Sequence, residues 1–192
     1  MIPPPSRLLH IYDVDDFSIV STAFVRRNNP LRSALDVVHP VPVEGGQVGL
    51  RNALDALVRD RQQFGRALFE THGSTGAIYF GGEAITGSDF RSFFTGRGYE
   101  KISPYLWARI YFNGCNVADA PNGWDFLDTA GRLFLRFGGG TTFAQTGLGR
   151  PIIFTGHVHH FGSSTSYSLW APGGVFAGHD VDGDGKGSCG RA

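Results

Sequence analysis

Two apolar segments of the chain each lead to a residue that can react. The segment Phe69-Glu70-Thr71-His72-Gly73 reaches a histidine followed by glycine, and Tyr111-Phe112-Asn113-Gly114-Cys115-Asn116 reaches a cysteine. A thiolate is a strong nucleophile, and a histidine beside it can take the thiol proton and later protonate a leaving amine. These residue types predict acyl transfer, with Cys115 as the nucleophile and His72 as the general base and acid.

The neighbours of the two reactive residues suggest supporting roles. The backbone N–H groups of Gly73 and Cys115 are candidates for holding an oxyanion, because glycine lets the chain turn toward a substrate. Glu70 precedes His72 by two residues, so it shares a strand face with the ring and can orient it. Residues expected at a substrate cleft are Glu70, Asn113 and Asn116. The alternative for the thiol is an unreactive buried residue, which is the commoner role of a single cysteine at a strand end.

The elements around the two segments predict how they come together. Apolar stripes indicate helices over residues 49–61, 88–94 and 122–137. Apolar and β-branched runs indicate strands over residues 8–14, 17–25, 66–71, 77–80, 107–113 and 141–146. Alternating strands and helices are typical of a parallel sheet covered by helices, in which the carboxyl ends of the strands share one edge. His72 and Cys115 are therefore expected side by side at that edge.

The C-terminal quarter of the chain has a different character. Two further strands are expected over residues 152–160 and 167–176 with no helix between them, which indicates an antiparallel extension of the sheet or a small β-subdomain. The 192 residues are consistent with one α/β domain. We expect a core over residues 1–150, a β extension over 151–177, and a Gly- and Asp-rich tail over 178–192.

Composition excludes several classes of partner. Lys plus Arg and Asp plus Glu each number 17, without blocks of like charge, which argues against nucleic acid or an anionic membrane.

The chain starts without the layout of a signal peptide, and no apolar run approaches the roughly 20 residues that span a bilayer. A cytoplasmic protein is therefore expected, unless another route exports it. Cys115 and Cys189 can form one disulfide, which would silence the nucleophile.

The paired segments resemble a known family. An apolar strand followed by His72-Gly73, and then one followed by Gly114-Cys115-Asn116, is similar to the caspase-like (caspase–hemoglobinase) fold of cysteine peptidases. The closer similarity is to caspase-like domains of large bacterial surface and adhesin-type proteins, over roughly residues 49–148. It implies a mainly parallel sheet flanked by helices and an endopeptidase that forms an acyl-enzyme on a His-Cys dyad. It also implies protein or peptide substrates and no required cofactor.

The resemblance leaves specificity and activity open. Arg-specific relatives often carry Asp two residues before the cysteine, where this chain has Asn113, so a basic residue before the scissile bond is not supported. An alternative function is a catalytically inactive caspase-like module that binds a partner.

Three other groups of residues suggest metal chemistry. His157 and His159 would lie on one face of a strand, which is a start for a metal site, and a metal-dependent hydrolase is a further alternative. Asp13, Asp15 and Asp16 follow the first strand and form either a cation or substrate site or a solvated turn. The carboxylates at the first, third and fifth positions of a calcium-loop-like segment suggest weak Ca²⁺ binding, with a flexible acidic tail as the alternative: Asp180, Asp182 and Asp184.

Overall fold

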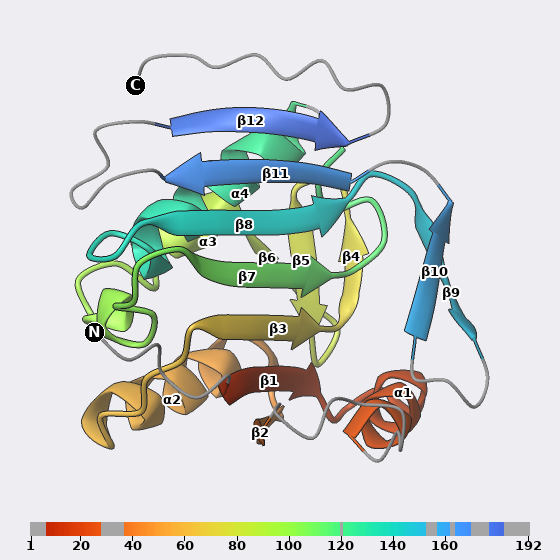
Figure 1. Ribbon diagram of the computed structural model, residues 1–192. Helices are drawn as coiled ribbons and strands as arrows, with labels where there is room; N and C mark the ends of the chain where they lie inside the picture. The colour runs from red at the N-terminus through yellow and green to blue at the C-terminus, as the bar shows by residue number, and fades with distance from the viewer. Residues whose placement is uncertain are drawn as a thin grey trace.

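The computed structural model describes the backbone of residues 7–27, 37–119, 121–152, 157–161, 164–169 and 177–182, with side chains up to residue 147 except 22 and 25–27. Within these residues, seven strands form the main sheet, in the order β12-β11-β8-β7-β3-β1-β2 (Figure 1). Five neighbours run parallel: β2 (Val37–Val43), β1 (Arg7–Asp13), β3 (Arg66–Glu70), β7 (Ala108–Asn113) and β8 (Gly140–Gln145). Next to β8, β11 (Ser164–Leu169) runs antiparallel to these five strands, and the edge strand β12 (Ala177–Asp182) runs antiparallel to β11 and so in the same direction as the five. The predicted α/β fold is thus confirmed.

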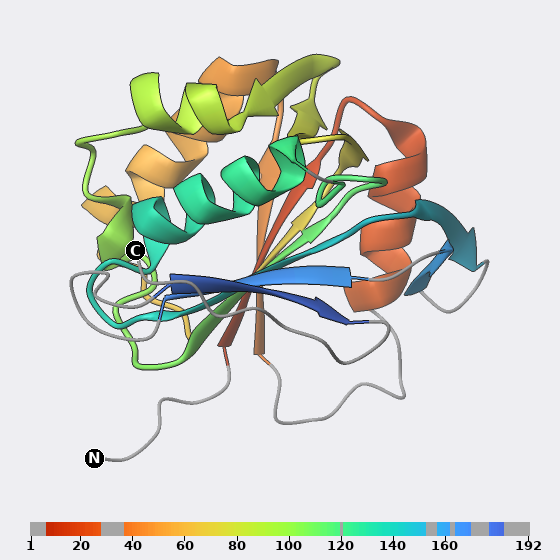
Figure 2. The ribbon, with the colours of Figure 1, turned by 90° about the horizontal axis from the view of Figure 1, so that it is seen from above.

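Helices α2, α3 and α4 cover one face of this sheet (Figure 2). Their bounds are α2 (Gly46–Arg59), α3 (Gly87–Ser92) and α4 (Asn122–Phe134), and a short 3₁₀ turn between α3 and β7, η1 (Tyr99–Lys101), packs against α2 and α4. The buried stripe Leu50, Leu54 and Leu57 of α2 faces the core, as its spacing predicts. No helix in the described part of the chain combines the length and apolarity needed to cross a membrane.

Successive side chains of the central strands point alternately to the helical face of the sheet and to the opposite face. Phe69 of β3 and Phe112 of β7 point to the helical face, where their rings stack 4.9 Å apart in the hydrophobic core. The next residue of each strand, Glu70 and Asn113, therefore points to the opposite face. His10 of β1, between the core residues Leu9 and Ile11, also belongs to that second face.

The prediction of a strand over residues 17–25 is wrong, because α1 (Phe17–Arg27) is a helix. Asp16 supplies the reason: its Oδ1 accepts the backbone N–H groups of Ser18 at 2.7 Å and Ile19 at 3.2 Å. Such a side-chain cap satisfies donors that the first turn of a helix leaves open, and it outweighs the β-branched composition that follows. Figures 1 and 2 place α1 beside the carboxyl ends of the parallel strands.

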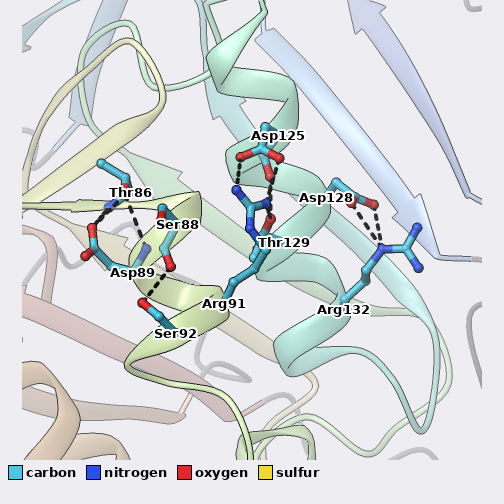
Figure 3. Close-up of polar contacts among 9 residues, drawn as sticks. All are labelled: Thr86, Ser88, Asp89, Arg91, Ser92, Asp125, Asp128, Thr129 and Arg132. Atoms are coloured by element: carbon cyan, nitrogen blue, oxygen red, sulfur yellow. Dashed lines mark hydrogen bonds and ion pairs between the residues drawn. The ribbon is translucent and has the colours of Figure 1, made fainter.

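The residues that cap α3 and α4 can be identified from their first turns. The cap of α3 is Thr86, whose Oγ1 accepts Asp89 N–H at 3.3 Å, while Asp89 Oδ2 accepts Thr86 N–H at 2.8 Å (Figure 3). This reciprocal capping box fixes where α3 begins. The cap of α4 is Pro121, since Asn122 is already helical.

The smaller sheets lie at the carboxyl end of the parallel strands (Figure 1). One is a three-stranded antiparallel sheet of β4 (His72–Ser74), β5 (Ala77–Phe80) and β6 (Glu83–Thr86). The other pairs β9 (Leu148–Ile152) with β10 (His157–Phe161). The antiparallel extension is thus split between this hairpin and the β11–β12 edge of the main sheet. Residues 178–182, expected in the tail, belong to β12.

Candidate functional site

The sheet register brings the two predicted reactive residues to one edge. Strands β3 and β7 are parallel neighbours, and their last paired residues are Glu70 and Asn113. His72 and Cys115 each follow two residues later. Both therefore leave the sheet at the same edge and from adjacent strands, which is where sites form in open α/β sheets.

Two glycines hold the outgoing segments in direct backbone contact. A Cβ atom on Gly73 would lie 2.8 Å from the carbonyl oxygen of Cys115, and one on Gly114 would lie 2.9 Å from the Cα of Gly73. Real Cβ atoms do not approach other atoms that closely, so the contact requires glycine on both sides. The backbone that carries His72 thus lies directly against the backbone that carries Cys115.

The ring of His72 is held by a carboxylate from a third strand end. Nε2 of His72 lies 3.1 Å from Oδ2 of Asp16, and the two side chains are 56% and 37% exposed. The Ser18 hydroxyl, and then the N–H of Ile19, the His72 ring and the N–H of Ser18, lower the pKa of Asp16 to about 2. The carboxylate is therefore ionised at any pH at which the protein would act.

Cys115 sits in a loop that is pinned at several points. It is half-buried and forms no disulfide with any residue that the structure describes. The following residue, Asn116, has φ of 56°, a left-handed conformation that asparagine tolerates better than most residues. Backbone N–H groups of Asn116 and Ala118 donate to the carbonyl oxygens of Gly147 and Gln145 at 3.0 and 2.9 Å. The loop after β7 is therefore tied to the end of β8.

Glu70, expected at the substrate cleft, is instead 1% exposed and bonded within the sheet. Its Oε2 lies 2.7 Å from Nε2 of His10, which is fully buried, and its Oε1 accepts Asn113 Nδ2 at 3.5 Å. Nδ1 of His10 is buried and has no hydrogen-bond partner among the described residues. These contacts link β1, β3 and β7 just before the strand ends. Asn113 and Asn116 are half-buried beside the two reactive residues.

Asp13, the last residue of β1, and Asp15 both accept hydrogen bonds from backbone N–H groups. Asp13 is buried, and its carboxylate accepts the N–H groups of Asp15 at 3.0 Å and Gly81 at 3.2 Å. Burial raises the pKa of Asp13, against the lowering effect of these two N–H groups. Asp15 Oδ2 accepts the N–H of Gly45 at 2.9 Å. Both carboxylates thus join loops at this edge, while Asp16 turns to His72.

Sequence reasoning missed His10 and the role of Asp16 for separate reasons. His10 lies inside an apolar strand and carries no local signal, because its partner Glu70 is 60 positions away. Asp16 was noted as an acidic residue near the end of a strand. Its role as a helix cap was missed because a strand, and not a helix, was predicted over residues 17–25. A helix that begins at Phe17 turns the chain at Asp16, and this turn brings its carboxylate to His72.

The predicted metal residues are only partly described. His157 and His159 lie two positions apart in β10, and Asp180 and Asp182 lie in β12, but their side chains fall outside the described part, as does Asp184 altogether. Among the described side chains, no group of three or more His, Cys, Asp or Glu could hold a metal ion.

Comparison with known proteins finds no family model and no curated protein that matches the chain.

Proposed function

We propose that the chain is a caspase-like cysteine endopeptidase in which Cys115 and His72 form the catalytic dyad. The observation that carries the proposal is the backbone contact between Gly73 and the Gly114–Cys115 segment at the ends of two adjacent parallel strands. It holds a thiol and an imidazole on neighbouring, rigidly joined segments, as nucleophilic catalysis requires.

The reaction then follows from the groups at the edge. His72 takes the proton of the Cys115 thiol, and Sγ attacks the carbonyl carbon of the scissile peptide bond. The backbone N–H groups of Gly73 and Cys115 stabilise the negative charge on the carbonyl oxygen. The C–N bond breaks as His72 protonates the leaving amine, which leaves a thioester. Water, deprotonated by His72, hydrolyses the thioester and restores the thiol.

Asp16 fits this mechanism as a positioning residue. Its carboxylate is ionised and can only accept a hydrogen bond, so the proton between it and His72 belongs to Nε2. In the neutral ring, Nδ1 then carries the lone pair and is the nitrogen available to the thiol. The same carboxylate stabilises the imidazolium that forms after proton transfer. A catalytic thiol needs reducing conditions, so the proposal places the activity in the cytoplasm.

A mixed library of internally quenched peptides tests the proposal. The wild-type chain should cleave members of the library, whereas Cys115→Ala and His72→Ala should each lose the activity. Cys189→Ser is the matched control, because it removes the other cysteine and should cleave at the wild-type rate. If no peptide is cleaved by any form of the chain, the peptidase proposal fails and an inactive binding module takes its place.

A further inference from the structure

A pocket of about 550 Å³ lies on the helical face of the sheet, between α4 and the segment that runs from α3 to η1. This volume falls in the range of about 300–1,000 Å³ that is usual for small-molecule sites. Leu133, Arg136 and Asp128 line it from α4 and the residues just after, and Glu100 lines it from η1. None of its lining residues takes part in the proposed dyad.

Two arginines of the pocket are fixed by ion pairs (Figure 3). Arg91 reaches from α3 to α4, where its Nη1 and Nη2 donate to the two carboxylate oxygens of Asp125 at 2.7 and 2.9 Å. Nη1 also donates to Thr129 Oγ1 at 2.7 Å. Arg132 Nε donates to both oxygens of Asp128, at 3.0 and 3.1 Å. On this side of the pocket, the guanidinium groups of Arg91 and Arg132 are therefore each paired with a carboxylate.

Two other charged residues of the pocket, Glu100 and Arg136, differ from Arg91 and Arg132 in having no ion pair within the described part of the chain. Neither makes a hydrogen bond or an ion pair with any residue that the structure describes, and no bond joins them to each other. Glu100 is half-buried and Arg136 is exposed. They reach the same pocket from different elements, so the pocket holds one carboxylate and one guanidinium without a counter-charge.

The signs of the lining charges restrict the ligand. A simple anion such as phosphate would face the carboxylates of Glu100 and Asp128, and a simple cation would face three arginines. A zwitterion avoids both conflicts, because its carboxylate pairs with a guanidinium and its ammonium pairs with a carboxylate. The partly buried side chain of Leu133 adds an apolar surface to the pocket.

We propose that this pocket binds a short peptide with free termini, its carboxylate on Arg136, its ammonium on Glu100 and an apolar side chain against Leu133. The proposal does not depend on the peptidase activity, because the pocket and the carboxyl edge share no residue.

Calorimetric titration of the full chain with four probes tests the proposal: leucyl-leucine, N-acetyl-leucyl-leucine, leucyl-leucinamide and inorganic phosphate. The free dipeptide should bind in a one-to-one complex. Each capped form should bind about tenfold more weakly or worse, because a hydrogen bond to a charged group is lost. Phosphate should bind no better than the capped forms.

Paired variants assign the two charges. Arg136→Gln should bind the dipeptide and its amide equally, and Glu100→Gln should bind the dipeptide and its acetylated form equally. Arg136→Lys keeps the charge and should retain most of the affinity. Arg59→Gln and Glu44→Gln change exposed charges elsewhere and serve as controls. The proposal is overturned if the dipeptide does not bind at about 10 mM, if the capped forms bind as well as the free one, or if folded variants bind like the wild type.

Discussion

His72 has one ring nitrogen bonded to Asp16, and this leaves the other for the thiol. The bond is 3.1 Å long between two partly exposed side chains, so solvent screens it. In the proposed mechanism, the bond contributes by fixing the tautomer and the orientation of the ring. A positioning role of this kind predicts a moderate loss of rate when Asp16 is changed, rather than the complete loss expected for Cys115.

Asp16→Asn should lower kcat about five- to tenfold with little change in KM. The amide can donate to Nε2 and so favours the wrong tautomer, and a weakened hydrogen bond of about 1 kcal/mol corresponds to this factor. Steady-state kinetics on a cleaved peptide measure it. Asp15→Asn is the matched control, because Asp15 bonds Gly45 and not His72. Equal kcat values for the Asp16 variant and the wild type would show that Asp16 does not position the ring.

Short segments at the ends of elements hold the site, and each can be tested by its effect on stability. Asp16 caps α1, Gly73 and Gly114 join the ends of β3 and β7, and the His10–Glu70 pair joins β1 to β3. The first two contacts lie at the carboxyl edge of the sheet, and the third adds a buried side-chain bond between two strands that the sheet already pairs.

Capping of α1 by Asp16 predicts a pH-dependent contribution to stability. The folded pKa of about 2 lies below the ordinary value of 3.8, so the ionised carboxylate favours the folded state. That contribution is complete above about pH 4 and is lost as the pH falls toward 2. Denaturant unfolding of the wild type and of Asp16→Asn should therefore differ at pH 5 to 6 and converge near pH 2. A difference that stays constant over this range would contradict the lowered pKa of Asp16 in the folded state, because asparagine can keep the capping bonds.

Gly73→Ala should destabilise the chain by about 1–3 kcal/mol and reduce peptidase activity, because the added methyl group pushes the His72 segment away from Cys115. Gly65→Ala is the matched control, since a Cβ there meets nothing within 4 Å and should change stability by less than about 1 kcal/mol. Thermal or denaturant unfolding of both variants measures the difference. If the two glycines tolerate alanine equally well, the segments are less closely packed than the contact requires.

The buried His10–Glu70 pair should show strong coupling in a double-mutant cycle. His10→Leu and Glu70→Leu should each cost about 3–5 kcal/mol in the free energy of unfolding, because each leaves a buried polar partner behind. The double variant should cost less than the two single losses added together. Additive losses would mean that the 2.7 Å contact carries no mutual stabilisation.

Across the whole molecule, local patterns predicted most of the sheet and the helices of the core. The stripes of α2 and α4 and the apolar runs of β3 and β7 are set by neighbouring residues, so a single sequence reveals them. The juxtaposition of His72 and Cys115 at one edge followed from the parallel arrangement. Of the features that escaped prediction, helix α1 depends on a local cap that its β-branched composition concealed, and the others depend on long-range contacts.

Three features were not predicted from sequence patterns. The α1 segment has a strand-like composition, and the capping bonds of Asp16 decide its conformation. Glu70 has the sequence spacing of a cleft residue, but a histidine on another strand buries it. The pocket charges Glu100 and Arg136 are 36 positions apart and become partners of one cavity only when η1 packs against α4.

The reactivity of Cys115 toward iodoacetamide tests the dyad most directly, because it requires no knowledge of the substrate. In chains that carry Cys189→Ser, the alkylation rate at pH 6 is measured with and without His72→Ala. A dyad predicts rapid labelling of Cys115 that falls about tenfold or more when His72 is removed, since the thiolate is the reacting form. Equal rates in the two chains would contradict the pairing of His72 with Cys115, and with it the proposed peptidase.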